Sequence, residues 1–249
     1  MNEKIALITG GSRGIGAETA KLLAENKFTV CINYRSNEEA AKSVVAEIES
    51  FGGKAVAFQA DVSKEAEVID LFKRLDNLDG YLSSLINNAG ILKQQCRLDQ
   101  LDEDRINEIF RVNVTSAFIC SREAVRRMST KNGGLGGSIV NVSSMAAVKG
   151  SPNEYVDYAA SKGAIDTLTK GLAMEVAAEG IRVNAVRPGL IYTDMHACGG
   201  EPARVDRLKE KIPMQRGGQA KEIAEAIYWL VSEKASFSTG SFIDASGGI

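Results

Sequence analysis

Short apolar segments alternate with amphipathic ones along almost the whole chain, and this alternation restricts the fold more than any other feature. The run from Lys4 to Thr9 reads as a strand buried on both faces, and the next segment, Gly14 to Glu25, follows the helical period. Strand-like and helical segments then repeat at intervals that suit right-handed βαβ crossovers. The sequence therefore predicts an α/β fold, a doubly wound parallel β-sheet with helices on both faces.

The same rhythm continues to the end of the sequence. No internal repeat, low-complexity tract or linker interrupts it, so we expect a single domain spanning residues 1–249. The expected strands cover residues 4–9, 28–33, 54–59, 82–87, 137–143, 181–186 and 241–244, and the expected helices cover residues 14–25, 37–50, 65–75, 102–127, 155–178 and 221–230.

Charge and composition exclude several classes of protein. Thirty basic and thirty-two acidic residues leave a formal net charge of -2, which favours no nucleic-acid or anionic membrane partner. The longest apolar runs are too short to span a bilayer, and the N-terminus lacks the regions of a signal peptide, so we expect a cytoplasmic protein. Four scattered cysteines and a single histidine, His196, predict no metal site.

A glycine-rich segment joins the first expected strand to the first expected helix. Its glycines follow the pattern Gly-x-x-x-Gly-x-Gly, at the βα junction where a parallel sheet binds dinucleotides. Residues without Cβ atoms allow the backbone to approach a pyrophosphate, and a helix N-terminus attracts the anion. The alternative is a glycine-rich turn without a ligand. The candidate phosphate-binding residues are Gly10, Ser12, Arg13, Gly14, Ile15 and Gly16.

The end of the second expected strand carries no carboxylate. An acidic residue there would bind the adenosine ribose hydroxyls and repel a 2′-phosphate. This chain has Arg35 and Ser36 instead, which can bind a phosphate, and Arg13 can supply a second positive charge. The sequence predicts a preference for NADP(H); if Arg35 lies in solvent instead, NAD(H) stays open as the cofactor.

Tyr158 and Lys162 are four residues apart in an expected helix, so they lie on one face. We expect the ammonium to favour the phenolate and to lower the pKa of the phenol from about 10. Such a tyrosine can exchange a proton with an alcohol or carbonyl oxygen. Taken alone, the pair also occurs by chance in many helices.

With these motifs in view, the chain resembles the short-chain dehydrogenase/reductase family over essentially all 249 residues. The resemblance implies a Rossmann-type fold and a cofactor held by residues spread along the chain. The family's motifs are present as Gly10 to Gly16, Asp61-Val62, Asn88-Ala89-Gly90, Tyr158 with Lys162, and Pro188-Gly189 followed by Ile191 and Thr193.

The resemblance also implies catalytic roles. Tyr158 is expected to be the general acid/base, and Lys162 to lower its pKa and to bind the nicotinamide ribose. Ser144 is expected to hydrogen-bond the substrate oxygen, and Asn113 to anchor a water on a proton path to Lys162. From the residues alone, the favoured interpretation of Asn113 is an interior asparagine that caps a local bend, and the resemblance reverses this preference.

The chain departs from the family pattern at two places. Ser144 precedes Tyr158 by fourteen residues, whereas close members commonly have thirteen, so Ser143 is the alternative. We favour Ser144, because Ser143 would point to the opposite face of an extended strand. Ala245-Ser-Gly-Gly248 stands where many relatives carry Asp-Gly-Gly, which affects only a local turn.

The function indicated is an NADP(H)-dependent oxidoreductase that interconverts a secondary alcohol and a carbonyl by hydride transfer. Within the family, the chain looks like the 3-oxoacyl-carrier-protein reductases and the bacterial glucose 1-dehydrogenases, so the substrate is a 3-oxoacyl thioester, a sugar or another ketone. The alternative is a catalytically silent NADP(H)-binding sensor or scaffold on the same fold. An extended-branch epimerase or dehydratase would carry a larger C-terminal substrate domain.

The resemblance finally suggests a substrate-side loop and helix insertion at about residues 190–218, with a short helix from Ala203 to Lys211. Related enzymes form tetramers, or dimers, through the two long helices, so we expect a homotetramer or dimer. The apolar residues of the second long helix can instead face the chain's own sheet. The residues in question are Ala164, Ile165, Leu168 and Leu172, and the basic residues that could face an acidic carrier or solvent are Arg204, Arg207, Lys209 and Lys211.

Overall fold

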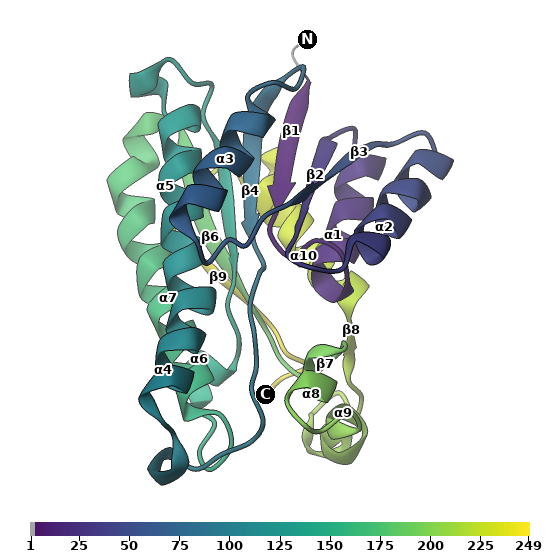
Figure 1. Ribbon diagram of the computed structural model, residues 1–249, viewed down its shortest axis with the longest axis vertical. Coiled ribbons are helices and arrows are strands. Elements are labelled where there is room, and N and C mark those ends of the chain that lie inside the picture. Colours follow the sequence, from purple (N-terminus) through teal and green to yellow (C-terminus); the bar gives the residue numbers. More distant parts are fainter. Residues whose placement is uncertain (1–2) are drawn as a thin grey trace.

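The computed structural model describes residues 3–249. Over this range, seven parallel strands form one sheet in the order β3-β2-β1-β4-β5-β6-β9, which confirms the expected fold class (Figure 1). The strand order reverses between β1 and β4, and in such sheets ligands bind outside the carboxyl ends of the strands at this point. The strands are β1 (Lys4–Ile8), β2 (Thr29–Tyr34), β3 (Lys54–Gln59), β4 (Tyr81–Asn87), β5 (Gly137–Val142), β6 (Ile181–Pro188) and β9 (Phe242–Ala245).

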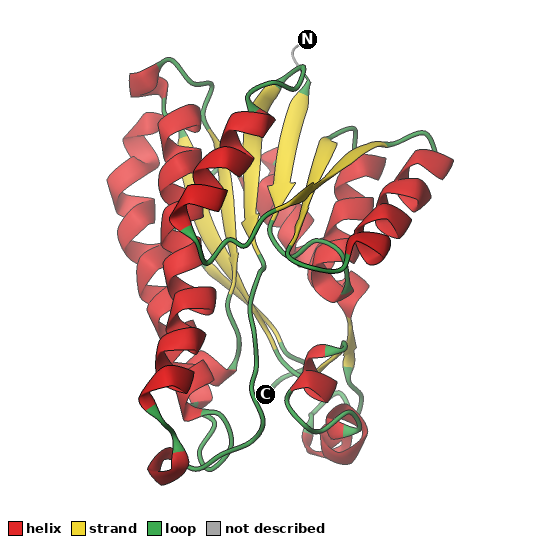
Figure 2. Ribbon diagram, viewed as in Figure 1, coloured by secondary structure: helices red, strands yellow, loops and turns green. Residues whose placement is uncertain are grey.

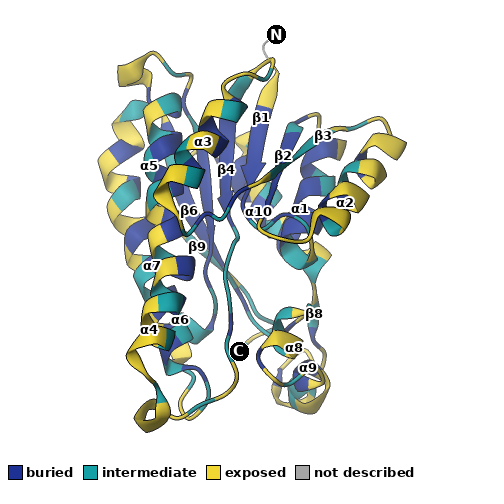
Figure 3. Ribbon diagram, in the orientation of Figure 1, coloured by how far each residue is buried: buried dark blue, intermediate teal, exposed yellow. Residues whose placement is uncertain are grey.

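Helices cover both faces of the sheet (Figures 1 and 2). In β1, Ala6 and Ile8 pack into one apolar core, whereas Ile5 and Leu7 pack into the other, because successive side chains point to opposite faces. The central strands are accordingly buried, the edge strands β3 and β9 are only partly buried, and the helices expose their outer sides (Figure 3). The first core contains α1 (Gly14–Glu25), α2 (Glu38–Ser50) and α10 (Ala220–Val231), and the second contains α3 (Glu65–Leu75), α5 (Ser116–Met128) and α7 (Val156–Val176).

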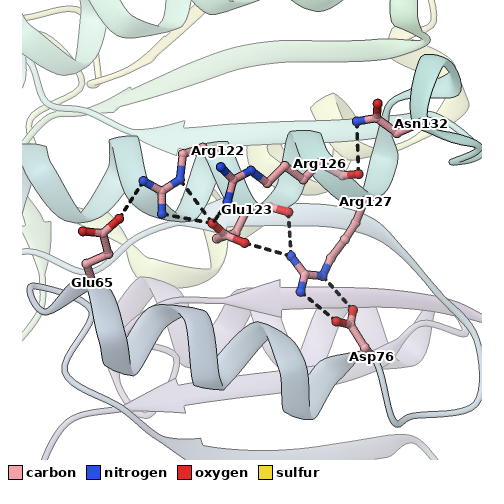
Figure 4. Close-up of polar contacts among 7 residues, drawn as sticks. All are labelled: Glu65, Asp76, Arg122, Glu123, Arg126, Arg127 and Asn132. Carbon is pink, nitrogen blue, oxygen red and sulfur yellow. Dashed lines mark hydrogen bonds and ion pairs between the residues drawn. The ribbon is translucent and has the colours of Figure 1, made fainter.

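A polar cluster joins α5 to α3 on the outer side of the second core (Figure 4). Glu123 of α5 is buried, and arginines from its own helix surround its carboxylate. One of them, Arg127, also pairs with Asp76 at the end of α3, with Nε 2.6 Å from Oδ1. Another, Arg122, reaches Glu65 at the start of α3, 2.7 Å away. The cluster therefore fixes both ends of α3 against α5.

The long helical region expected over residues 102–127 is present, but it is not α-helical throughout. It divides into α4 (Glu103–Phe110), a π-helical turn over Arg111–Thr115, and α5. Asn113 lies in the middle of this turn, and its amide is bonded to the backbone of Ile91. The sequence did not indicate this turn, because a π-helical turn keeps helical periodicity in the sequence while widening the backbone.

The expected insertion at residues 190–218 lies between β6 and α10, beyond the carboxyl ends of the strands (Figure 1). Two short parallel strands, β7 (Ile191–Tyr192) and β8 (Gly218–Gln219), pair at its base. Between them are α8 (Met195–Cys198) and α9 (Arg204–Leu208), and a 3-10 turn over Lys209–Lys211 completes the expected short helix. The strands and α8 are too short to produce a periodic pattern in the sequence.

Two kinds of feature are absent from residues 3–249. No helix within residues 3–249 is long and apolar enough to cross a membrane. The same residues contain no group of three or more histidine, cysteine, aspartate or glutamate side chains placed to hold a metal ion.

Candidate functional site

The glycine-rich turn between β1 and α1 requires its glycines. Gly10 and Gly14 have φ angles of +62° and +52°, which side chains disfavour. A Cβ at Gly16 would lie 2.5 Å from the carbonyl oxygen of Gly10 and 2.6 Å from the Asn88 amide nitrogen. No side chain of the described residues caps the N-terminus of α1, so its first N–H groups are left for a ligand.

Thr9 and Asn88 join this turn to the loop after β4. The Thr9 hydroxyl oxygen accepts hydrogen bonds from the backbone N–H groups of Asn88 and Ala89, both at 3.0 Å. The Asn88 amide donates to the carbonyl oxygens of Thr9 and Gly10, both at 2.9 Å. Two motifs that are far apart in the sequence are therefore one unit, and Thr9 belongs to it although the sequence did not predict Thr9 as a site residue.

A cavity of about 290 Å³ opens at this unit. Its lining brings together most of the residues predicted to bind the cofactor. The Arg35 side chain is exposed, and its charge acts on Asp61. Burial tends to raise the pKa of Asp61. Hydrogen bonds from Ser63 and the charge of Arg35 have the larger effect together, so the pKa of Asp61 is lowered. The predicted residues in this lining are Gly10, Ser12, Arg13, Gly14, Ile15, Arg35, Ser36, Asp61, Val62, Asn88, Ala89, Gly90 and Thr193.

A second cavity, of about 380 Å³, adjoins the first, since Ile15, Asn88 and Thr193 line both. Two predicted residues, Gly16 and Asn113, line neither cavity and lie behind the linings. The other predicted residues in the second lining are Ser144, Tyr158, Lys162, Pro188, Gly189 and Ile191.

Tyr158 lies near the start of α7, next to Ser144 at the end of β5. Burial raises the pKa of Tyr158 to about 12, against the hydrogen bonding of the neighbouring Ser144 hydroxyl. The sequence predicted that this pKa would be lowered, and this was wrong for the protein without a cofactor. The effect of burial, which raises the pKa, is larger than the effect of the hydrogen bond, which lowers it. The neighbouring serine, Ser143, directs its hydroxyl to Asp166, 2.6 Å away.

Lys162 lies one helical turn after Tyr158, as expected. Its Nζ is 5.6 Å from the centre of the Tyr158 ring and donates a hydrogen bond to the Val142 carbonyl oxygen at 2.8 Å. Burial lowers the pKa of Lys162 to about 8, and the charge of Asp166 opposes this shift. The lysine can therefore change its charge close to neutral pH.

Asn113 acts on the backbone of the loop after β4. Its amide accepts a hydrogen bond from the Ile91 N–H at 2.8 Å, and donates to the Ile91 carbonyl oxygen and to Ser161, both at 3.1 Å. The position where Gly90 would carry a Cβ is 3.4 Å from Asn113 Oδ1 and 3.7 Å from Lys162 Nζ. Asn113 therefore holds the backbone at Ile91 in place. Its Oδ1 and Lys162 Nζ also lie close to the same position beside Gly90.

Ion pairs fasten the insertion across the second cavity. Arg204 of α9 is buried and pairs with Glu154, in the loop before α7, and with Glu201. The Tyr155 hydroxyl donates to the Gly199 carbonyl oxygen at 3.2 Å. Of the four basic residues considered for a carrier, three are thus paired within the chain: Arg204, Arg207 with Glu201, and Lys209 with Asp206, whereas Lys211 lines the cavity.

Sequence reasoning missed much of the second lining. These residues come from the loop after β4, from the start of α6 (Ala146–Lys149), from the start of α7 and from the insertion, and they share no motif. For most of them, only their apolar character could have indicated a binding wall, and apolar residues are common throughout the chain. The missed residues include Leu92, Met145, Tyr155, His196, Leu208 and Ile212.

Comparison with known proteins agrees with this geometry. Residues 10–249 match a family model described as Enoyl-(Acyl carrier protein) reductase. The structure resembles that of a short-chain dehydrogenase/reductase from Serratia marcescens, with a TM-score of 0.90 and 32% sequence identity over 99% of this chain and 98% of that chain. The chain belongs to the short-chain dehydrogenase/reductase family. It is therefore an enzyme, an oxidoreductase of this family.

Two curated relatives cover the same length as this short-chain dehydrogenase/reductase. The uncharacterized oxidoreductase YgfF of Escherichia coli (strain K12) is 62% identical over 244 residues, which cover 98% of this chain and 99% of the relative. The 3-oxoacyl-[acyl-carrier-protein] reductase FabG of Staphylococcus epidermidis is 36% identical over 246 residues, which cover 99% and 98%.

Short-chain dehydrogenases/reductases use a nicotinamide cofactor, and the residues present fit such a group. A side chain at Gly16 would collide with the turn, and the N–H groups at the start of α1 match a pyrophosphate. The first cavity leads from this turn to Arg35 at one end and shares residues with the Tyr158 cavity at the other.

Proposed function

We propose that this enzyme interconverts a secondary alcohol and a carbonyl by hydride transfer with NADP(H), and that Tyr158 is the general acid/base. One observation carries the proposal: the cavity that contains Ser144, Tyr158 and Lys162 adjoins the cavity at the glycine turn. Gly10 to Gly16, Arg35, Asp61, Asn88 to Gly90 and Thr193 would hold the cofactor.

When bound, the nicotinamide supplies or accepts the hydride. The Ser144 hydroxyl would donate a hydrogen bond to the substrate oxygen, where negative charge develops during reduction. The Tyr158 phenol would give its proton to that oxygen, or take one from an alcohol in the reverse direction. Lys162 would keep positive charge near the phenol, which offsets the effect of burial on the pKa of Tyr158.

Asn113 would support the proton path. Its Oδ1 and Lys162 Nζ both lie close to Gly90, and a larger side chain at Gly90 would fill the point that they share. A water held there by the asparagine would pass protons to Lys162.

The catalytic role of Tyr158 is tested by its replacement with phenylalanine, which keeps the ring and removes the proton. We expect Tyr158→Phe to reduce kcat by about 100-fold or more while NADPH still binds. Nicotinamide absorbance with a panel of 3-oxoacyl thioesters, sugars and simple ketones measures turnover. The FabG relative makes 3-oxoacyl thioesters the first class to try. If the unmodified protein binds NADPH but turns over no substrate, this result would instead favour the sensor or scaffold function.

The preference for NADP(H) rests on Arg35, whose side chain is exposed at the rim of the first cavity. We expect Arg35→Ala to lower kcat/KM for NADPH by about tenfold or more and to leave that for NADH within about twofold, because only NADPH carries the 2′-phosphate. Arg97→Ala is the matched control, since Arg97 is an exposed arginine that lines neither cavity. Equal losses for both cofactors would contradict the assignment.

A homotetramer or dimer would bury the outer sides of α4 and α5, where Ile106 and Phe118 are exposed. Ile165 and Leu168 do not contribute, since they pack inside the chain against Ala117 of α5. Light scattering of the protein and of Phe118→Glu tests this: the variant should have a lower mass, and an unchanged mass would exclude this surface.

The cytoplasmic location stays a prediction that cell fractionation can test.

A further inference from the structure

Three chain segments end at the Tyr158 cavity, and each carries a polar residue beside a proposed site residue. Ser143 precedes Ser144 at the end of β5, Arg187 precedes Pro188 at the end of β6, and Asp166 lies one helical turn after Lys162 in α7. None of the three belongs to the motifs that point to catalysis.

Asp166 connects these segments through both of its carboxylate oxygens. The Ser143 hydroxyl donates to Oδ1 at 2.6 Å, and the Arg187 guanidinium donates from Nε to Oδ2 at 2.9 Å. The side chains of Asp166 and Arg187 are only 14% and 16% exposed, so water weakens this pair little. One carboxylate therefore ties β5, β6 and α7 together.

The guanidinium of Arg187 is also held from β9. Its NH1 lies 3.3 Å from Asp244 Oδ1, and its central carbon is 3.9 Å from the centre of the Phe242 ring. Because the ring and the two carboxylates fix the plane of the guanidinium, Arg187 has one orientation from which to meet Asp166.

The Asp166 carboxylate also acts on Lys162, which lies one turn earlier in α7. On α7, the charged or titratable groups near the Lys162 ammonium are Tyr158 and Asp166. Strand β5 contributes the Val142 carbonyl, and the loop after β4 and the π-helical turn contribute only Gly90 and the neutral Asn113. Arg187 approaches from β6 with its charge directed to Asp166.

We propose that Asp166 is a positioning residue of this active site. Its carboxylate fixes the ends of β5 and β6, and hence Ser144 and the Pro188-Gly189 turn, relative to Tyr158 and Lys162. Its charge also favours the ammonium form of Lys162. The catalytic part of this inference rests on the proposed function, whereas the effects on Lys162 and on cofactor binding do not.

Asp166→Asn tests the charge while keeping the shape of the side chain. The pKa of Lys162 in the protein alone is measured by NMR titration of isotope-labelled lysine, with Lys162→Met used to assign the signal. We expect Asp166→Asn to lower this pKa by about one unit, because an opposite charge is removed. Where turnover is observed, the pH profile of kcat should shift toward acid by the same amount.

Asp166→Ala tests the positioning of the Pro188-Gly189 turn. We expect it to weaken NADPH binding, measured by fluorescence titration, by about fivefold or more, and Arg187→Lys to weaken it less. Asp244→Asn is the matched control, because Asp244 contacts the same guanidinium but neither Ser143 nor Lys162. Far-UV circular dichroism and thermal melting verify folding; if Asp166→Ala does not fold, Asp166→Asn and Arg187→Lys are compared with the control instead.

The proposal is overturned if the Lys162 pKa and the NADPH affinity of the Asp166 variants match those of Asp244→Asn. If both change as expected but no substrate turns over, the proposed reaction fails and the positioning role stands. If turnover is present and only the melting temperature falls, Asp166 is structural and the proposal is wrong.

Discussion

At the scale of single residues, the two adjacent serines after β5 show how strand geometry separates roles. Both serines line the cavity, but the Ser144 hydroxyl lies beside Tyr158, whereas Ser143 is buried and donates its hydroxyl hydrogen to Asp166. Successive residues of an extended chain point to opposite sides, so only one of two adjacent hydroxyls can face the substrate. If Ser144 takes the catalytic role, we expect the loop around α6 to accommodate the extra residue between the serine and the tyrosine.

Alanine at each serine separates these roles. We expect Ser144→Ala to lower kcat by about 100-fold with little change in the KM for NADPH, since it removes a donor to the reacting oxygen. Ser143→Ala should have a smaller effect on kcat and should weaken NADPH binding, because it loosens the contact with Asp166. Steady-state kinetics measure both, and loss of turnover in the Ser143 variant alone would reverse the assignment.

At the scale of elements, Glu123 couples α5 to α3 and makes their packing dependent on pH. Burial works to raise the pKa of Glu123, but hydrogen bonds and charges from Arg127, Arg122 and Arg126 outweigh it and lower that pKa below the usual 4.5. The stabilisation is therefore fully present above about pH 4.5 and is lost as the pH falls through the lowered value.

A glutamine at this position removes the charge. We expect Glu123→Gln to lower the free energy of unfolding at pH 7 by about 1–3 kcal/mol, and the difference from the unmodified protein to shrink at acid pH. Urea unfolding at several pH values measures it. Glu65→Gln, at the exposed end of the same cluster, should change the stability by less than about 0.5 kcal/mol. A difference for Glu123→Gln that does not depend on pH would contradict the linkage.

The elements also show what the sequence can and cannot predict. The ends of β1 and β3 are within one residue of expectation, because both strands are short apolar runs next to glycines that mark a turn. The π-helical turn at Asn113 keeps helical spacing, and the pairing of β7 with β8 depends on contacts between residues far apart in the chain. At the site, Gly10 to Gly16 and the Tyr158–Lys162 pair carry local signals. Asp166 and Arg204 act through partners that only the folded chain supplies.

At the scale of the molecule, elements from the two ends of the chain pack together. Helix α1 lies against α10, and β9 completes the sheet beside β6. The Tyr228 hydroxyl of α10 donates to Asn26 at the end of α1, 2.7 Å away. These contacts join the first and last parts of the chain, so a division into two consecutive domains would break them. We therefore propose that the protein is one domain.

A single domain should lose its structure in one step. The chain has one tryptophan, Trp229 in α10, whose fluorescence reports on the unfolding of this C-terminal helix. We expect its fluorescence and the far-UV circular dichroism to change at the same urea concentration, at a fixed protein concentration. Separate transitions would show that the two ends unfold independently and would contradict the single domain.

The paired strands at the base of the insertion have a consequence for how such enzymes diversify. Residues 190–218 begin after β6 and end before α10 at neighbouring points, since Ile191 pairs with Gly218. Proton transfer is assigned to residues outside this segment, on α7 and at the end of β5. The segment could therefore be exchanged as a cassette for that of a relative with another specificity. The incoming segment must keep a residue that can replace Thr193 at the cofactor cavity and a partner for Glu154 where Arg204 now stands.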